Sequence, residues 1–160
     1  MQIDMNSVLN EDISERIRKV EEYSMVNFPK SYIDFIKEYN VGIPTTNEFL
    51  CNNHFYAIDR FLGFVNEYKT SPLGNYDIAV VLSQIDTRLT DNPDLIGDEL
   101  IPISSLFAGD YVCLDYRENK EMPSICIWSH KESGEFEPVT YKAADTFSDF
   151  VAMLKQHVVK

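Results

Sequence analysis

The chain has 160 residues, of which 44% are apolar and 12% aromatic, which suits one domain with a single core. This composition excludes disordered and collagen-like chains, which lack the large apolar side chains needed to build a core. Its 26 acidic and 14 basic residues give a formal net charge of −12, which disfavours nucleic acid as a partner because phosphate binding needs clustered Lys and Arg.

The first 42 residues are predicted to hold two helices. Asn10 can cap the first, and its apolar residues recur at helical spacing. They are Ile13, Ile17 and Val20. The second helix is predicted to start at Pro29, because a missing N–H costs nothing in the first turn. Asn40 or Gly42 can end this helix in a left-handed conformation.

Short aromatic-rich runs over residues 45–65 predict two or three strands. A Pro- and Gly-containing loop at 71–75 follows, and apolar spacing over 78–89 then favours another helix. Strands are predicted at 111–116 and 124–128 and a possible third strand at 136–141, joined by short turns into a meander. Thr146, with Asp149 three residues later, is typical of a helix start. This order predicts an α+β domain with a mainly antiparallel sheet covered by helices.

Six segments resemble, in the same order, the motifs of the SUKH superfamily. They are 28–36 (FPKSYIDFI), 39–42 (YNVG), 100–103 (LIPI), 108–116 (AGDYVCLDY), 125–130 (ICIWSH) and 144–150 (ADTFSDF). The similar family motifs are LPxxYxxFL, xNGG, lIPIA, GGDYICLDYR, VxxWDHE and ADSFxEFL. The chain departs from them where the Gly pair is broken by Val41, and where Ser129 replaces the usual acid.

This superfamily includes fungal cell-wall-assembly regulators and many bacterial toxin-immunity proteins. The resemblance covers about 28–154 and implies one SUKH-like α+β domain over 1–160, with an N-terminal helix and lead-in at 1–27. It also implies a protein without chemistry of its own, which binds and neutralises a partner that is often a nuclease toxin.

Two Cys–His pairs have spacings that zinc sites use, Cys51 with His54 and Cys126 with His130. Cys113 and Cys126 nevertheless fall among apolar residues of predicted strands, where a free thiol behaves as a small core side chain. Neither these histidines nor His157 lies in a nucleophile motif, and no phosphate-binding glycine loop is present. We therefore expect no catalytic residue, no metal and no cofactor.

No stretch approaches the roughly 20 apolar residues of a membrane span. The first residues lack the basic and apolar pattern of a secretory signal, and the number of cysteines is odd. We therefore expect a cytoplasmic protein with reduced thiols and no membrane contact.

Acidic residues dominate the segment 77–115, which holds eight of them against Arg88 alone. Such a segment either keeps the protein in solution or forms an acidic face that captures a basic partner. We expect this partner to be a toxin domain. The residues predicted to bind this partner are Asp98, Glu99, Asp110, Tyr111, Asp115 and Trp128.

Two other functions remain open. One is a regulatory or scaffold domain with a cellular protein partner, as the fungal relatives imply. The other is a small hydrolase or ligand-binding protein, which requires a deep pocket that gathers His54 or His130 with several carboxylates. Aromatic residues between 49 and 76 are more numerous than one sheet face readily buries, so some are expected at the surface.

Overall fold

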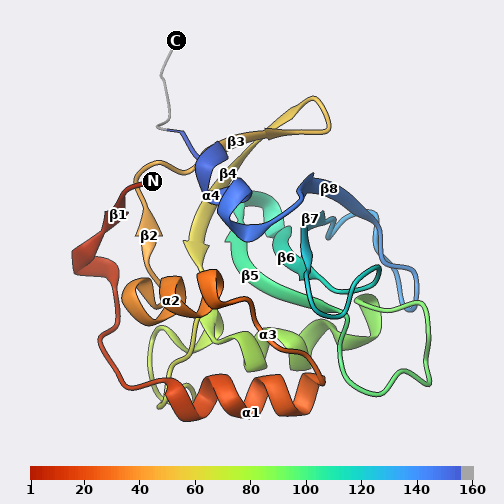
Figure 1. The fold of residues 1–160 in the computed structure, drawn as a ribbon, viewed down its shortest axis with the longest axis horizontal. Helices are drawn as coiled ribbons and strands as arrows, with labels where there is room; N and C mark the ends of the chain where they lie inside the picture. Colours follow the sequence, from red (N-terminus) through yellow and green to blue (C-terminus); the bar gives the residue numbers. More distant parts are fainter. Residues whose placement is uncertain (156–160) are drawn as a thin grey trace.

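The structure is a computed structural model that describes residues 1–155 (Figure 1). The helices are α1 (Ser14–Ser24), α2 (Lys30–Tyr39), α3 (Ile78–Ile85) and α4 (Phe147–Met153). The strands are β1 (Ile3–Asp4), β2 (Ile43–Pro44), β3 (Glu48–Cys51), β4 (His54–Phe61), β5 (Leu100–Leu106), β6 (Tyr111–Asp115), β7 (Ser124–Trp128) and β8 (Thr140–Ala144). Short 3-10 turns are η1 (Met5–Ser7), η2 (Gly74–Tyr76), η3 (Asp86–Arg88) and η4 (Phe107–Gly109).

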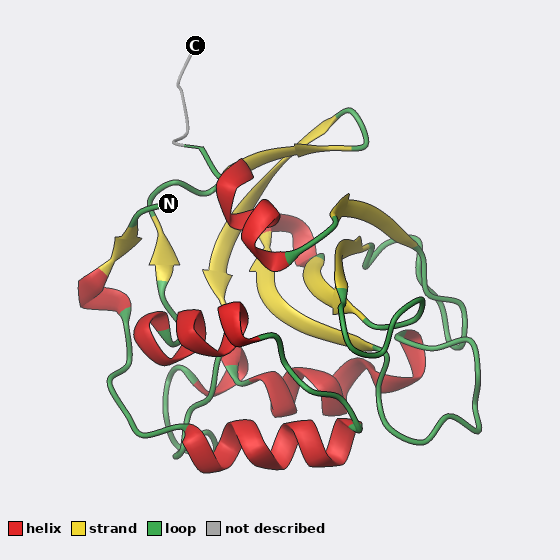
Figure 2. Cartoon of the chain, in the orientation of Figure 1, coloured by secondary structure: helices red, strands yellow, loops and turns green. Residues whose placement is uncertain are grey.

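The main sheet has six strands in the order β3-β4-β5-β6-β7-β8, and every neighbouring pair is antiparallel. Strands β1 and β2 form a separate two-stranded sheet. Figure 2 shows the helices gathered around the strongly curved main sheet. The predicted α+β class and the antiparallel meander are therefore confirmed.

The predicted helices are present, but the first is capped differently from the expectation. Helix α1 starts at Ser14, and its backbone N–H donates to the carboxylate of Asp12 at 3.1 Å, so Asn10 is not the cap. The Thr146 prediction is confirmed, because its hydroxyl accepts from the Asp149 backbone N–H at 3.1 Å.

The end of α2 also differs from the prediction. Asn40 has φ −49°, and it is Val41, with φ +52°, that takes the left-handed conformation. The Asn40 side chain is buried, where it accepts from Phe64 N and donates to Phe64 O, both at 2.8 Å. These bonds to a segment 24 residues away hold Asn40 in place, so the reversal of the chain falls on the next residue.

The last strand lies later in the chain than the predicted 136–141. Phe136 has φ +56° and donates its backbone N–H to Thr87 O, while Gly134 pairs with Glu137 in a tight turn. Pro138 has no N–H to give to a ladder, so pairing with β7 begins only at Thr140.

One hydrophobic cluster joins the sheet to all four helices. Its largest fully buried side chains include Trp128, Tyr32, Phe61, Phe64 and Phe150. The three cysteines are buried and free, as expected of core thiols. Across residues 1–155, every helix is too short or too polar to span a bilayer.

Candidate functional site

The predicted site begins on the hairpin of β6 and β7. The three central residues of β6, Val112, Cys113 and Leu114, are all buried in the core, whereas Tyr111 and Asp115 at its two ends keep part of their surface exposed. Tyr111 lies opposite Trp128, and Asp115 lies opposite Ser124. Both faces of β6 are therefore covered at its centre, and the predicted exposed face reaches the surface only at Tyr111 and Asp115.

Asp110 and Tyr111 lie at the start of β6. The Asp110 carboxylate accepts from the backbone N–H of His130 at 2.8 Å, which ties the turn before β6 to the loop after β7. The Tyr111 ring lies 5.9 Å from the ring of Trp128, and burial raises the pKa of the Tyr111 hydroxyl. This end of the hairpin is therefore ordered by contacts within the protein.

Asp115, at the other end of β6, is neutralised by a neighbour. Arg117 grips it through two nitrogens, at 2.9 and 2.8 Å, and also donates to the Thr140 hydroxyl at 2.7 Å. This pairing raises the pKa of the Arg117 guanidinium. A basic partner would have to displace Arg117 to reach the carboxylate.

Trp128 has 0% of its surface exposed. Its indole N–H donates to Arg88 O at 2.9 Å, and the Arg88 guanidinium lies 4.8 Å above the ring. Arg88 also donates to the carbonyls of His130 and Ser133. Trp128 is therefore a core residue that packs beneath Arg88 and the loop after β7. The partner contact predicted for it would require this part of the structure to open.

Asp98 and Glu99 precede β5, in the long loop that follows η3. Asp98 accepts from the Ser24 hydroxyl at 2.7 Å, and its backbone N–H donates to Ser24 O at 2.9 Å. Glu99 forms an ion pair with Lys120 at 3.2 Å. Gly97 permits this close docking, because it has φ +86° and an added Cβ would lie 2.5 Å from Ser24 O.

The six predicted residues thus lie in two groups. Asp98, Glu99 and Asp115 are close, because Leu100 pairs with Asp115 and Tyr116 donates its N–H to Glu99 O. Asp110, Tyr111 and the buried Trp128 lie at the far end of β6, about 13 Å away along the strand.

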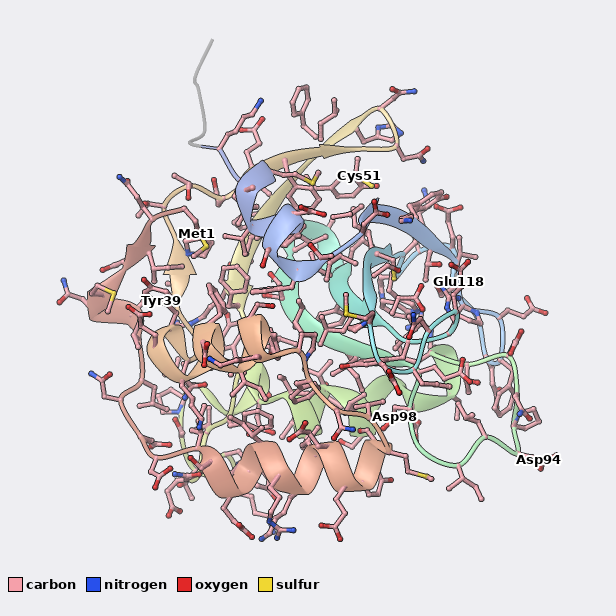
Figure 3. The ribbon with its side chains drawn as sticks, in the orientation of Figure 1. Met1, Tyr39, Cys51, Asp94, Asp98 and Glu118 are labelled. Atoms are coloured by element: carbon pink, nitrogen blue, oxygen red, sulfur yellow. The ribbon has the colours of Figure 1, made fainter. Side chains whose placement is uncertain are left out.

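A groove of about 1000 Å³ lies where Asp98 and Glu99 emerge. One wall is α1, with Arg16, Lys19, Val20 and Tyr23, and the other is α3, with Ala79, Val80, Leu82 and Ser83. Residues 86–100 supply most of the remaining lining. Figure 1 shows α1 and α3 running side by side, and Figure 3 places Asp98 beside the end of α1 and Asp94 at the outer edge of the loop.

Two polar ties frame the groove along α1. At one end Arg16 binds the carboxylate of Asp77, the N-cap of α3, at 2.7 Å. At the other end Ser24 binds Asp98. Since these α1 residues are eight positions apart, the open stretch between them is about 12 Å long.

Sequence reasoning missed the apolar side chains around this groove. Ile96 is 81% exposed, and Tyr23 and Met25 are also largely exposed near the place where the loop meets α1. A signal was present, since Tyr23 lies off the apolar stripe of α1 and Met25 follows the end of this helix. Ile96 is brought near them by the hydrogen bond between Ser24 and Asp98, which are 74 residues apart, and no local sequence pattern reveals this contact.

The Asp98 carboxyl provides a test of the local electrostatics. Burial and the nearby charge of Asp86 raise its pKa, which the Ser24 hydrogen bond only partly offsets. A raised pKa in the folded state means that the ionised form destabilises the fold at neutral pH. We expect Asp98→Asn to raise the thermal unfolding midpoint at pH 7.5, and the gain to vanish as the pH falls below about 4, where both states are protonated. A gain of equal size at both pH values would contradict this assignment.

The two described histidines lie outside the groove. Neither His54 nor His130 lines it, so it is not the His-containing pocket that a hydrolase would require. Across residues 1–155, no group of three or more His, Cys, Asp or Glu side chains is placed to hold a metal ion. His157 lies outside the described residues.

Comparison with known proteins gives one finding. The family model SUKH_6, described as SMI1-KNR4 cell-wall, matches residues 14–151. Neither the curated proteins nor the solved structures give a match. The match begins before the resemblance at residue 28 and so takes in α1. Because the match spans most of its length, the chain belongs to the SMI1-KNR4 family of the SUKH superfamily.

Proposed function

We propose that this protein is a non-catalytic binding protein that neutralises a basic toxin domain through its acidic surface. Family membership supports a role in immunity or regulation. One observation carries the narrower proposal. Four carboxylates within residues 86–98 form no ion pair with any described residue. They are Asp86, Asp91, Asp94 and Asp98.

Asp86, Asp91 and Asp94 can attract a basic partner without breaking an ion pair between described residues, whereas Asp98 already accepts a hydrogen bond from the Ser24 hydroxyl at 2.7 Å. Asp91 and Asp94 are exposed on the loop between η3 and β5. Asp110 and Asp115 are less suited to first contact, because His130 and Arg117 already engage them. We therefore place the first encounter with the partner on the loop, and the hairpin beside it becomes a secondary contact.

The test is capture of a purified toxin domain encoded by the gene next to that of this protein. The double variant Asp91→Lys, Asp94→Lys should lower the association rate about tenfold or more at low salt, because attraction becomes repulsion. The matched control is Glu38→Lys, Asp145→Lys, which changes the net charge equally at exposed sites on α2 and just before α4. Rates would be measured by surface plasmon resonance at about 50 and 300 mM NaCl. Equal rates for both variants, or no salt dependence, would refute the electrostatic mechanism.

A regulatory or scaffold role is the second candidate, favoured by the cell-wall description of the matching family model. It predicts a cellular partner and no toxin gene beside the gene for this protein. Co-purification from the native host, followed by identification of the captured protein, separates the two functions. A captured nuclease or other toxic enzyme supports neutralisation, and a captured enzyme of wall synthesis supports the regulatory role.

A further inference from the structure

The groove between α1 and α3 is apolar along its floor and open at its rim. Val20, Leu82 and Leu89 are buried core residues that line it, and Leu95 is partly buried beside them. Ile96, also part of the lining, is 81% exposed. Exposed apolar side chains at the rim of an apolar hollow are typical of a surface that another molecule covers.

The charges around the groove are mainly negative. Asp86 and Asp98 line it and lie close enough that the charge of Asp86 raises the pKa of Asp98. On the opposite wall Arg16 is already held by Asp77, whereas Lys19, the other cation of α1 in the lining, forms no ion pair with any residue of 1–155. A cation placed between Asp86 and Asp98 would relieve their mutual repulsion.

We propose that this groove receives a short segment of the basic partner, in which one large apolar side chain is flanked by Lys or Arg. This inference rests on the proposed function and specifies the contact that holds the partner after the encounter. The apolar side chain lies against Tyr23, Leu82 and Ile96. The flanking cations pair with Asp86 and Asp98.

The dimensions support a segment of this kind. The open stretch of about 12 Å along α1 corresponds to two helical turns or to four extended residues. A volume of about 1000 Å³ accommodates one large side chain with its neighbours.

The hairpin β3–β4 offers a matched control surface. Leu50 and Phe55 lie directly opposite each other on it, and Phe55 is 74% exposed. Neither residue lines the groove. If any exposed apolar residue sufficed for partner contact, this pair would serve as well as Ile96.

The probe is a fluorescein-labelled synthetic peptide with one Leu flanked on each side by two Lys. Its binding would be measured by fluorescence anisotropy, and its location by amide chemical-shift mapping. Ile96→Ser and Asp86→Lys should each weaken binding about tenfold or more. Both residues are exposed, so neither change removes core packing. Phe55→Ser and Glu38→Lys are the matched controls and should leave the affinity within about twofold.

The expected shifts map to residues 16–24 and 79–99, which are the walls of the groove. Replacing Leu by Ser in the peptide should weaken binding as much as Ile96→Ser does. No binding up to about 1 mM peptide, shifts located elsewhere, or equal losses in the control variants would each overturn the proposal. Toxin capture that persists in Ile96→Ser and Asp86→Lys would also overturn it while leaving the proposed function intact. If the wild-type protein fails to capture the toxin domain, the proposed function itself is rejected.

Discussion

Replacing Asp77 by Ala should lower the free energy of unfolding by about 3–5 kcal/mol, because it leaves the Arg16 guanidinium without its partner in a largely enclosed site. Asp77 has 0% exposed surface and five contacts on its two oxygens. Besides the two contacts with Arg16, the donors are the backbone N–H groups of Val65, Ala79 and Val80. One carboxylate thus caps α3, fixes the chain after β4 and ties both to α1.

The measurement is urea unfolding followed by far-UV circular dichroism. Asp77→Asn should fall between wild type and Asp77→Ala, since an amide oxygen can still cap α3 but its NH₂ group cannot accept from Arg16. Lys30→Met is the control for a surface ion pair. It breaks the exposed pair of Lys30 with Asp34 and should cost no more than about 0.5 kcal/mol. A loss for Asp77→Ala as small as that for Lys30→Met would show that the network does not stabilise the fold.

The parts of the fold that the sequence predicted depend on local patterns. The helix after residue 77 follows from its apolar spacing, and the start of α4 from Thr146 and Asp149. The paired strands β6 and β7 are bounded by turn residues that are recognisable in the sequence. In each case residues within about twenty positions of one another determine the structure.

The cap of α1 was mistaken locally, because Asp12 and not Asn10 accepts from Ser14, but the other two errors arose where distant residues decide the conformation. Asn40 could have ended α2 by itself, but its side chain is committed to Phe64, so Val41 makes the reversal. The strand predicted at 136–141 lies instead at Thr140–Ala144, because the backbone N–H of Phe136 is engaged by the carbonyl of Thr87 in η3. Neither contact has a local signature.

The same division applies to the candidate site. The acidic count located the charge between residues 77 and 115. Within residues 1–155, the structure separates the carboxylates engaged inside the protein from those without an ion pair. Asp77 is buried under Arg16, and Asp115 is gripped by Arg117, whereas Asp91 and Asp94 face solvent. The groove itself exists because Gly97 lets the loop dock on Ser24. The sequence therefore showed where the negative charge lies, but it did not show which of the carboxylates are free to contact a partner.

Replacing Trp128 by Ala should also lower the free energy of unfolding by about 3–5 kcal/mol, since the change removes the largest fully buried side chain. Trp128→Phe keeps most of the apolar volume but loses the hydrogen bond to Arg88 O and weakens the contact with its guanidinium. We expect it to cost about 1–2 kcal/mol. Unfolding should be followed by circular dichroism and not by tryptophan fluorescence, because Trp128 is the chain's single tryptophan and both variants lack it. Phe55→Ala, at an exposed position, should stay within about 0.5 kcal/mol of wild type.

The Phe variant also distinguishes support from direct contact. If Trp128 acts only by holding Arg88, His130 and the adjoining loops, Trp128→Phe should capture the toxin domain with wild-type affinity at temperatures where it remains folded. If Trp128 instead swings outward to anchor the partner, the same variant should lose affinity about tenfold or more while remaining folded. The second result would restore Trp128 as a binding residue and would require the loop between η3 and β5 to open on binding. The bond from its indole to Arg88 and the guanidinium above its ring favour the first.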